Sequence, residues 1–138
     1  MAGRRQGGSV RPDMATRILL VDDHPAYLER ARALLVQHDG VEVVGIALSG
    51  EEALVMAADL RPDLVLLDFQ MPGINGIETA RRLKLLDPEL YIVIVTAHDD
   101  EAYRVAAREA GANRWIAKTS IADELGGILA SLPDEVGE

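Results

Sequence analysis

The feature that most constrains the fold of this chain is a regular alternation of short apolar runs with segments of helical periodicity. Each apolar run is short and aliphatic, as expected of a strand buried on both faces, and each is followed by apolar residues at helical spacing. The predicted strands span residues 18–21, 41–47, 63–68, 91–96 and 114–118. The predicted helices span about 25–39, 49–60, 75–86, 99–111 and 120–132. Short connections imply right-handed crossovers, and therefore a doubly wound α/β fold with helices on both faces of a five-stranded parallel sheet.

Local signals support the predicted helix boundaries. Three residue pairs have the spacing of a capping box at a helix start: Ser49 with Glu52, Asn75 with Glu78, and Ser120 with Asp123. Pro25 is tolerated in the first turn of the first helix. Gly126 and Gly127 each cost roughly 1 kcal/mol relative to Ala. The last helix is therefore expected to be the weakest, unless another group packs closely on these glycines.

The length of 138 residues and the 49% hydrophobic content fit one domain with a buried core. We expect the domain to span residues 17–132. Residues 1–16 are rich in glycine and lack apolar periodicity, so they are predicted to be a disordered N-terminal tail, and 133–138 form a short C-terminal tail. The absence of cysteine excludes disulfides, thiol catalysis and cysteine-based zinc sites.

The net charge of −9 disfavours direct DNA binding by this chain, because an acidic body repels phosphate. No apolar run approaches the ~20 residues of a transmembrane helix. Arg4 and Arg5 are not followed by an apolar stretch, so the N-terminus does not resemble a secretory signal. We therefore expect neither DNA nor a membrane among the direct partners.

Polar residues stand where four of the predicted strands end. Asp22 and Asp23 follow the first strand; Asp68, Thr96 and Lys118 end the third, fourth and fifth. The carboxyl ends of parallel strands meet at one edge of the sheet, where doubly wound proteins bind ligands. Each residue alone has an ordinary explanation as a cap, a turn former, a strand residue or a surface lysine. Their joint placement is what favours a functional site.

The chemistry of such a site follows from its charges. Three carboxylates at one edge repel one another unless a cation, a lysine or a shared proton compensates. Oxygen ligands suit a hard cation such as Mg²⁺, for which Mn²⁺ can substitute. A carboxylate beside that cation is able to attack phosphorus and form an acyl phosphate, while Lys118 and the Thr96 hydroxyl bind the phosphoryl oxygens.

Four stretches carry a family resemblance: ILLVDDHP, DLVLLDFQMPGINGIETARRL, IVIVTAHDD and GANRWIAK. In this order and spacing they resemble the receiver domain of two-component response regulators, including receivers of helix-turn-helix transcription factors. The resemblance covers about residues 17–132. It implies a flavodoxin-like (βα)5 three-layer sandwich with strand order 2-1-3-4-5. It also implies phosphorelay signal transduction, with catalysis limited to the protein's own phosphorylation and dephosphorylation.

The resemblance also assigns roles at the metal site. Asp68 matches the phosphoacceptor, which also contacts the metal. Asp23 matches a direct Mg²⁺ ligand, and Asp22 matches its partner that acts through water. Gln70 occupies the position whose backbone carbonyl completes the coordination.

The phosphoryl group has its own matching positions. Thr96 and Lys118 match the hydroxyl and the amine that bind it, and Ala97 matches the small residue that leaves room for it. Gln70 and His98 occupy positions that border the attacking water, so they are expected to tune the dephosphorylation rate. The alternative is that both are exposed loop residues without effect.

The resemblance implies a switch built from Thr96 and Trp115. The family usually has Tyr or Phe where this chain has Trp115, and it often has Pro after the lysine, where this chain has Thr119. These two departures leave open whether Trp115 rotates and whether the Lys118–Thr119 peptide bond is cis. Switching is expected on the face made by the fourth helix, fifth strand and fifth helix, for partner docking or homodimer formation.

Three rival classes are weaker. A magnesium-dependent phosphatase with an aspartyl nucleophile would place D-x-D after the first strand and need a cap over its pocket. A flavodoxin-like redox domain would need a phosphate loop where Asp22 and Asp23 stand. An unphosphorylated receiver-like interaction module remains the alternative function, although the complete set of acidic residues argues against it.

The expected partners are a sensor histidine kinase or a phosphotransfer protein, in a bacterial cytoplasm. The ratio of 12 Arg to 2 Lys is typical of a GC-rich bacterial genome. The chain either acts alone by protein contact or is a fragment of a longer DNA-binding regulator.

Overall fold

All five predicted strands form, and they make one parallel sheet in the computed structural model, which describes residues 15–132. The sheet has the order β2-β1-β3-β4-β5, which confirms the predicted topology. Its strands are β1 (Thr16–Val21), β2 (Val41–Ala47), β3 (Leu64–Asp68), β4 (Tyr91–Thr96) and β5 (Arg114–Ala117).

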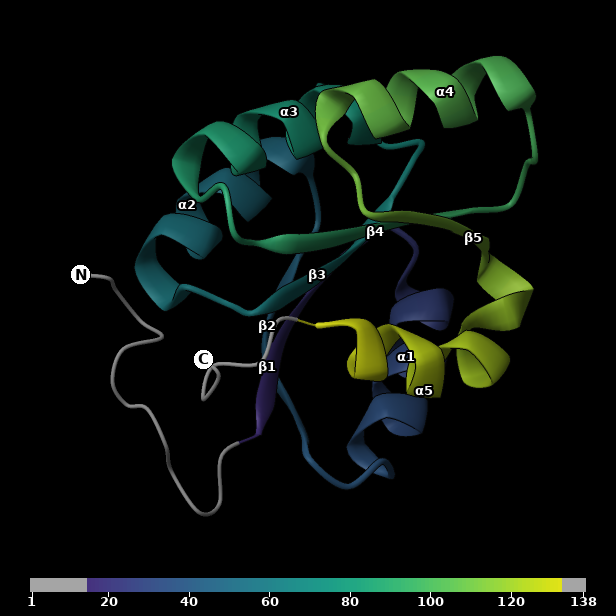
Figure 1. Cartoon of the computed structure of the whole chain (residues 1–138). Helices are drawn as coiled ribbons and strands as arrows, with labels where there is room; N and C mark the ends of the chain where they lie inside the picture. Colours follow the sequence, from purple (N-terminus) through teal and green to yellow (C-terminus); the bar gives the residue numbers. More distant parts are fainter. Residues whose placement is uncertain (1–14, 133–138) are drawn as a thin grey trace.

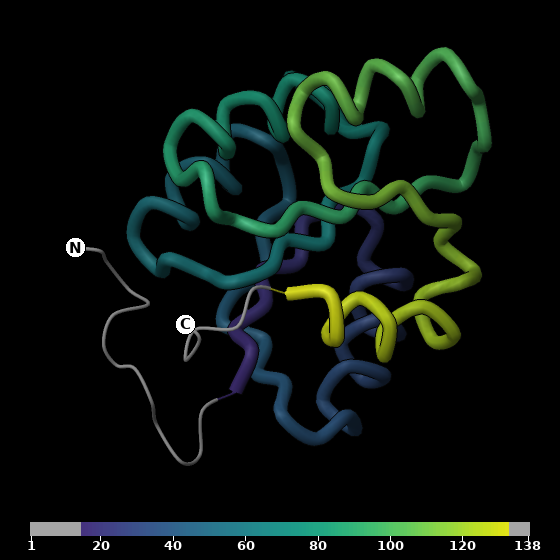
Figure 2. The backbone as a smooth tube through the Cα atoms, viewed as in Figure 1, coloured from purple at the N-terminus to yellow at the C-terminus, as the bar shows by residue number. Residues whose placement is uncertain are grey.

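Five α-helices cover the two faces of the sheet and complete the predicted three layers. They are α1 (Pro25–Val36), α2 (Gly50–Leu60), α3 (Gly76–Leu86), α4 (Glu101–Ala110) and α5 (Ile121–Ser131), with a 3-10 turn η1 (Lys118–Ser120) before α5. Helices α2, α3 and α4 lie on one face, and α1 and α5 lie on the other (Figure 1). The backbone trace shows the same division (Figure 2).

The core consists of two aliphatic layers, one on each side of the sheet. Alternate residues of a strand enter opposite layers: Leu19 packs towards α2 and α3, whereas Ile18 and Leu20 pack towards α1 and α5. The same alternation holds in β3, where Val65 and Leu64 belong to different layers. Burial on both faces explains why the strands appear in the sequence as continuous apolar runs.

Two of the three predicted caps form. The Ser49 hydroxyl accepts a hydrogen bond from the Glu52 backbone N–H at 3.0 Å, and the Asn75 side chain accepts one from Glu78 N–H at 2.9 Å. The Glu52 carboxylate returns to the backbone N–H of Leu48 at 2.7 Å, one residue before the N-cap. This variant of the capping box still satisfies backbone donors at the start of α2.

The predicted cap at Ser120 is wrong. Ser120 belongs to η1, with φ −101° and ψ 2°, and among the described residues its side chain caps no N–H of α5. An N-cap residue needs an extended backbone to turn its side chain towards the helix, and the 3-10 turn prevents this. Asp123 therefore lies in the first turn of α5 without a capping-box partner.

Some boundaries differ from the prediction. Strand β1 begins at Thr16, one residue before the predicted domain start, because Thr16 N–H bonds to Gly40 carbonyl at 2.7 Å. Helix α4 begins at Glu101 rather than residue 99, since Asp100 supplies its cap. Helix α1 ends at Val36, before the predicted stop. The predicted tail 133–138 and residues 1–14 of the N-terminal tail lie outside the described residues.

The glycines of α5 have almost no packing partner. A Cβ on Gly126 would meet no atom within 4 Å, and one on Gly127 would meet only Arg114 at 3.7 Å. The carbonyl of Gly127 accepts hydrogen bonds from the Arg114 guanidinium at 3.3 Å and from the Ser131 hydroxyl at 2.8 Å. Arg114 therefore ties this part of α5 to β5 through the backbone.

The loop between β3 and α3 returns closely upon the end of β3. A Cβ on Gly76 would lie 2.6 Å from the carbonyl oxygen of Asp68, so only glycine fits there. The Gly76 N–H bonds to the Phe69 carbonyl at 2.8 Å, and the Glu51 carboxylate of α2 accepts a bond from Ile74 N–H at 3.2 Å. These contacts fix the backbone that follows Asp68.

Candidate functional site

The predicted carboxylates converge at the carboxyl edge of the sheet. Asp22 and Asp23 follow β1, and Asp68 is the last residue of β3, which pairs directly with β1. Strands β2 and β3 lie on opposite sides of β1, so this edge is the switch point of the topology. Asp22 and Asp68 are buried, with side chains only 3% and 4% exposed. Two buried carboxylates at the same edge of the sheet require a positive charge nearby to compensate for their repulsion and burial.

Lys118 supplies that charge from the opposite end of the site. Its ammonium lies 2.8 Å from Asp22 Oδ2 and 3.6 Å from Asp68 Oδ1. The lysine follows β5, two strands away from β3, and its side chain is 17% exposed. The predicted meeting of these three residues is therefore found in the structure.

Thr96 closes β4 next to β3 and is 3% exposed. Its hydroxyl donates to the His98 carbonyl at 2.9 Å and accepts from the His98 N–H at 3.0 Å. The hydroxyl is therefore engaged with its own loop in this structure. Ala97, His98 and Gln70 are exposed at the same edge of the sheet.

His24 is a member of this cluster that sequence reasoning missed. Its Nδ1 lies 2.7 Å from Asp22 Oδ1, 3.3 Å from Asp23 Oδ1 and 3.8 Å from Asp68 Oδ2. The hydrogen bond to Asp22, together with the charge of that carboxylate, raises the pKa of His24. The sequence signal was a histidine directly after two aspartates, where the turn into α1 brings the ring back over the carboxylates.

The pKa of Asp68 is raised to about 6. Burial is the main cause, and the charge of Asp22 adds to it. Lys118, the Gln70 backbone N–H and His24 oppose the rise by favouring the ionised carboxylate. Without a bound cation, burial and the neighbouring Asp22 therefore disfavour the ionised form of Asp68.

The cluster fits a hard divalent cation. Ligand atoms of Asp22, Asp23, His24 and Asp68 all lie within 4.8 Å of one another. One buried oxygen of each aspartate accepts no hydrogen bond from residues 15–132, although Lys118 Nζ lies 2.8 Å from that of Asp22, and His24 Nδ1 lies 3.3 and 3.8 Å from those of Asp23 and Asp68. Carboxylate oxygens of this kind are ligands that Mg²⁺ prefers, whereas an imidazole suits softer metals.

Trp115 lies apart from the carboxylates and is connected to them through Phe69. The Phe69 ring, directly after Asp68, is 5% exposed and lies 5.5 Å from the Trp115 ring, centroid to centroid. It also lies 4.7 Å from the Tyr103 ring of α4. The backbone peptide bond between Lys118 and Thr119 is trans, since residues 15–132 contain no cis peptide bond.

The parallel sheet with this acidic switch point defines the class of protein. Residues 18–130 match the family model of the response regulator receiver domain, so the chain belongs to that family. Receiver domains in general bind Mg²⁺ in an acidic pocket and interact with histidine kinases or other phosphodonors. Phosphorelay signalling is the general function of this family, and the recognition made from the motifs is confirmed.

Curated relatives are regulators of transcription or response regulators. The chain is 40% identical over 102 residues to response regulator GacA of Pseudomonas viridiflava, covering 74% of this chain and 48% of GacA. It is 37% identical over 111 residues to the transcriptional regulatory protein LiaR of Bacillus subtilis, covering 79% of this chain and 52% of LiaR. The chain thus spans about half the length of these relatives.

Solved structures agree with the assignment of the fold. A two-component response regulator of the LuxR family from Aurantimonas superimposes with a TM-score of 0.78 at 33% identity, over 90% of this chain and 94% of the other. The response regulator domain of Thermotoga maritima CheB gives a TM-score of 0.76 at 27% identity, over 86% of this chain and 96% of the other.

In the part of the chain that the structure describes, no helix has the length and apolar character to cross a bilayer.

Proposed function

We propose that this chain accepts a phosphoryl group on Asp68 from a histidine kinase, a phosphotransfer protein or a small phosphodonor, and that Mg²⁺ is required. The observation that carries the proposal is the contact of Lys118 with both Asp22 and Asp68, at 2.8 and 3.6 Å, beside unsatisfied carboxylate oxygens. A nucleophile, a cation site and a fixed ammonium are the parts that in-line phosphoryl transfer requires.

The metal is assigned to the oxygen donors of the site. Asp23 and Asp68 are proposed as direct ligands, the Gln70 carbonyl as a third, and Asp22 as a ligand through water. Mn²⁺ would substitute, because it accepts the same oxygen ligands. A bound cation would supply charge neutralisation, and it would favour the ionised form of Asp68, whose pKa is raised by burial and by the charge of Asp22.

Thr96, Ala97 and Lys118 are proposed to hold the phosphoryl oxygens. Lys118 is already beside Asp68, whereas the Thr96 hydroxyl must leave the His98 carbonyl to reach the new group. Because phosphorylation adds nearly two negative charges, it favours the state in which Thr96 turns inwards. Trp115 is proposed to follow, because its ring packs against Phe69, the residue directly after Asp68.

The chain is proposed to catalyse only its own phosphorylation and dephosphorylation, and so to lack an enzymatic activity towards other substrates. Gln70 and His98, both exposed beside the site, are proposed to set the dephosphorylation rate through the attacking water. Substitution of either residue with alanine tests this role, by the lifetime of the acyl phosphate. An unchanged lifetime in both variants would contradict it.

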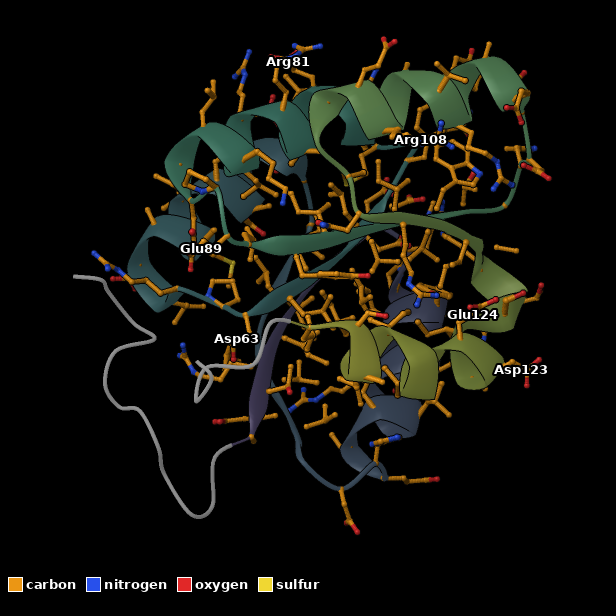
Figure 3. All side chains as sticks on the ribbon, in the orientation of Figure 1. Asp63, Arg81, Glu89, Arg108, Asp123 and Glu124 are labelled. Carbon is orange, nitrogen blue, oxygen red and sulfur yellow. The ribbon has the colours of Figure 1, made fainter. Side chains whose placement is uncertain are left out.

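The output surface is proposed to be the face of α4, β5 and α5, through which a partner or a second copy binds. Charged side chains project from this face, among them Arg108 on α4, and Asp123 and Glu124 on α5 (Figure 3). Direct DNA binding is assigned to no part of this chain, given its charge of −9. We place the protein in the bacterial cytoplasm, as is general for two-component response regulators.

The test is an intact mass spectrum after incubation with acetyl phosphate and Mg²⁺. We expect one phosphoryl adduct, lost in Asp68→Asn and in EDTA, and kept in Asp39→Asn, a matched change in the exposed turn before β2. The single tryptophan, Trp115, reports on switching by fluorescence in the same samples. Wild-type protein without any adduct from either acetyl phosphate or phosphoramidate would favour the alternative, an unphosphorylated interaction module.

A further inference from the structure

The Lys118 ammonium has an aromatic neighbour as well as its carboxylates. It lies over the Tyr27 ring of α1, 4.5 Å from the ring centroid. On its other side are Asp22 Oδ2 at 2.8 Å and Asp68 Oδ1 at 3.6 Å. A cation this close to the face of an aromatic ring is attracted by the electron density of the ring.

Tyr27 is itself held firmly. It packs against the core layer between the sheet and helices α1 and α5, which includes Leu28 and Ile121. Burial, with the charges of Asp22 and Asp68, raises the pKa of Tyr27 to about 12. The ring is therefore neutral at neutral pH, and its packing against the core holds it in place.

The Lys118 side chain also borders an open groove. A groove of about 540 Å³ opens between α1 and the start of α5, and Tyr27, Arg30, Lys118 and Ile121 are among the residues that line it. A lysine side chain has a flexible four-carbon stem with many rotamers. Without the ring, the ammonium would keep its two carboxylates but lose one of the contacts that hold it away from this groove.

We propose that Tyr27 is a positioning residue, whose ring holds the Lys118 ammonium at the phosphoacceptor. This inference rests on the proposed function and deepens it, because it assigns a residue of α1 to the geometry of phosphoryl transfer. An aliphatic residue at position 27 fills the space but offers no attraction for a cation. A phenylalanine keeps the ring face and loses only the hydroxyl.

The contact is tested first by NMR, independently of phosphorylation. The chain has two lysines, Lys84 and Lys118, so selective lysine labelling gives one signal from each ε-methylene. Ring current from Tyr27 should shift the Lys118 signal upfield. The shift is expected to persist in Tyr27→Phe and to vanish in Tyr27→Leu, while Lys84 stays unchanged as internal reference. A Lys118 signal at the same position in wild type and Tyr27→Leu would overturn the proposal.

The role is then tested by the phosphorylation rate with acetyl phosphate and Mg²⁺. We expect Tyr27→Leu to slow phosphorylation roughly fivefold, the factor that a typical cation–π attraction represents, and Tyr27→Phe to match wild type. In a Lys118→Met background, Tyr27→Leu should add nothing, because the group it positions is gone. An equal slowing in both backgrounds, or in Tyr27→Phe, would overturn the positioning role.

Two controls separate the possible failures. Thermal unfolding checks that each variant is folded, and Tyr27→Met replaces Tyr27→Leu if the latter is not. Wild-type protein that takes no phosphoryl group would overturn the proposed function, and with it the positioning role in transfer. The lysine shift decides separately whether the ring holds the ammonium.

Discussion

Asp68→Asn is expected to stabilise the metal-free protein, although it removes the proposed phosphoacceptor. In the folded protein the pKa of Asp68 is about 6, compared with an ordinary value of 3.8, because burial and Asp22 disfavour its charge. At neutral pH this carboxylate is ionised in both states, and the folded state bears the cost. Asparagine keeps the shape of the side chain and removes the charge.

The pH dependence has a definite sign. Because the folded protein binds this proton more tightly than the unfolded chain does, stability falls as pH rises from about 4 to about 6, and the penalty is constant above that. This increase in the pKa of Asp68 corresponds to roughly 3 kcal/mol of lost folding free energy at neutral pH. Solvent screening at the open edge of the sheet reduces this, so we expect a gain of about 1–2 kcal/mol for Asp68→Asn above pH 7.

The assay is urea unfolding in EDTA at pH 7.5 and again near pH 4, followed by circular dichroism. The gain should be full at pH 7.5 and largely absent near pH 4. Saturating Mg²⁺ should stabilise wild type and so narrow the difference. Asp39→Asn, an exposed aspartate away from the site, should change stability little at either pH. A destabilised Asp68→Asn at pH 7.5, or an equal gain at both pH values, would refute the electrostatic account.

Three further predictions concern the surroundings of the site. Asn75→Ala should cost about 1 kcal/mol in chemical denaturation, because α3 loses the hydrogen bond to Glu78 N–H; no loss would mean that water replaces the cap. Gly76→Ala should destabilise by about 1–3 kcal/mol, since its Cβ would meet the Asp68 carbonyl at 2.6 Å, and wild-type stability would contradict the close approach. His24→Gln in EDTA should lower the melting temperature near pH 6 and change it little near pH 9. Asp22 raises the pKa of His24, so His24 stabilises the folded protein only while its ring is protonated. An equal loss at both pH values would point to packing instead.

The sequence was sufficient for the sheet because its signals are local and strong. A strand that is buried on both faces, as β3 is, appears as a continuous apolar run, so its location can be predicted without deciding which face points to the core. The ends of these strands could be aligned because parallel topology places them at one edge. Asp22, Asp68 and Lys118 were therefore brought together correctly, although Lys118 lies far from Asp22 in the chain.

What the sequence could not provide was the direction of individual side chains. Tyr27 falls within the predicted first helix and His24 lies directly before it, yet the structure places both against charged groups of the site. Their orientation depends on how α1 leaves β1, and no spacing rule expresses that angle. The cap at Ser120 was predicted wrongly for a similar reason. Whether a 3-10 turn forms between β5 and α5 depends on the path of the chain at the end of β5, which no spacing rule expresses.

The hydroxyl of Thr96 already makes two hydrogen bonds, both within its own loop. A phosphoryl oxygen at Asp68 would therefore compete for a donor that is already in use, and the exchange trades one bond for another. Such exchanges have a small net free energy, even when each bond is strong. In the proposed switch, this exchange therefore favours neither the resting nor the signalling state by much, so the added charge of the phosphoryl group decides which one predominates, and its loss restores the first.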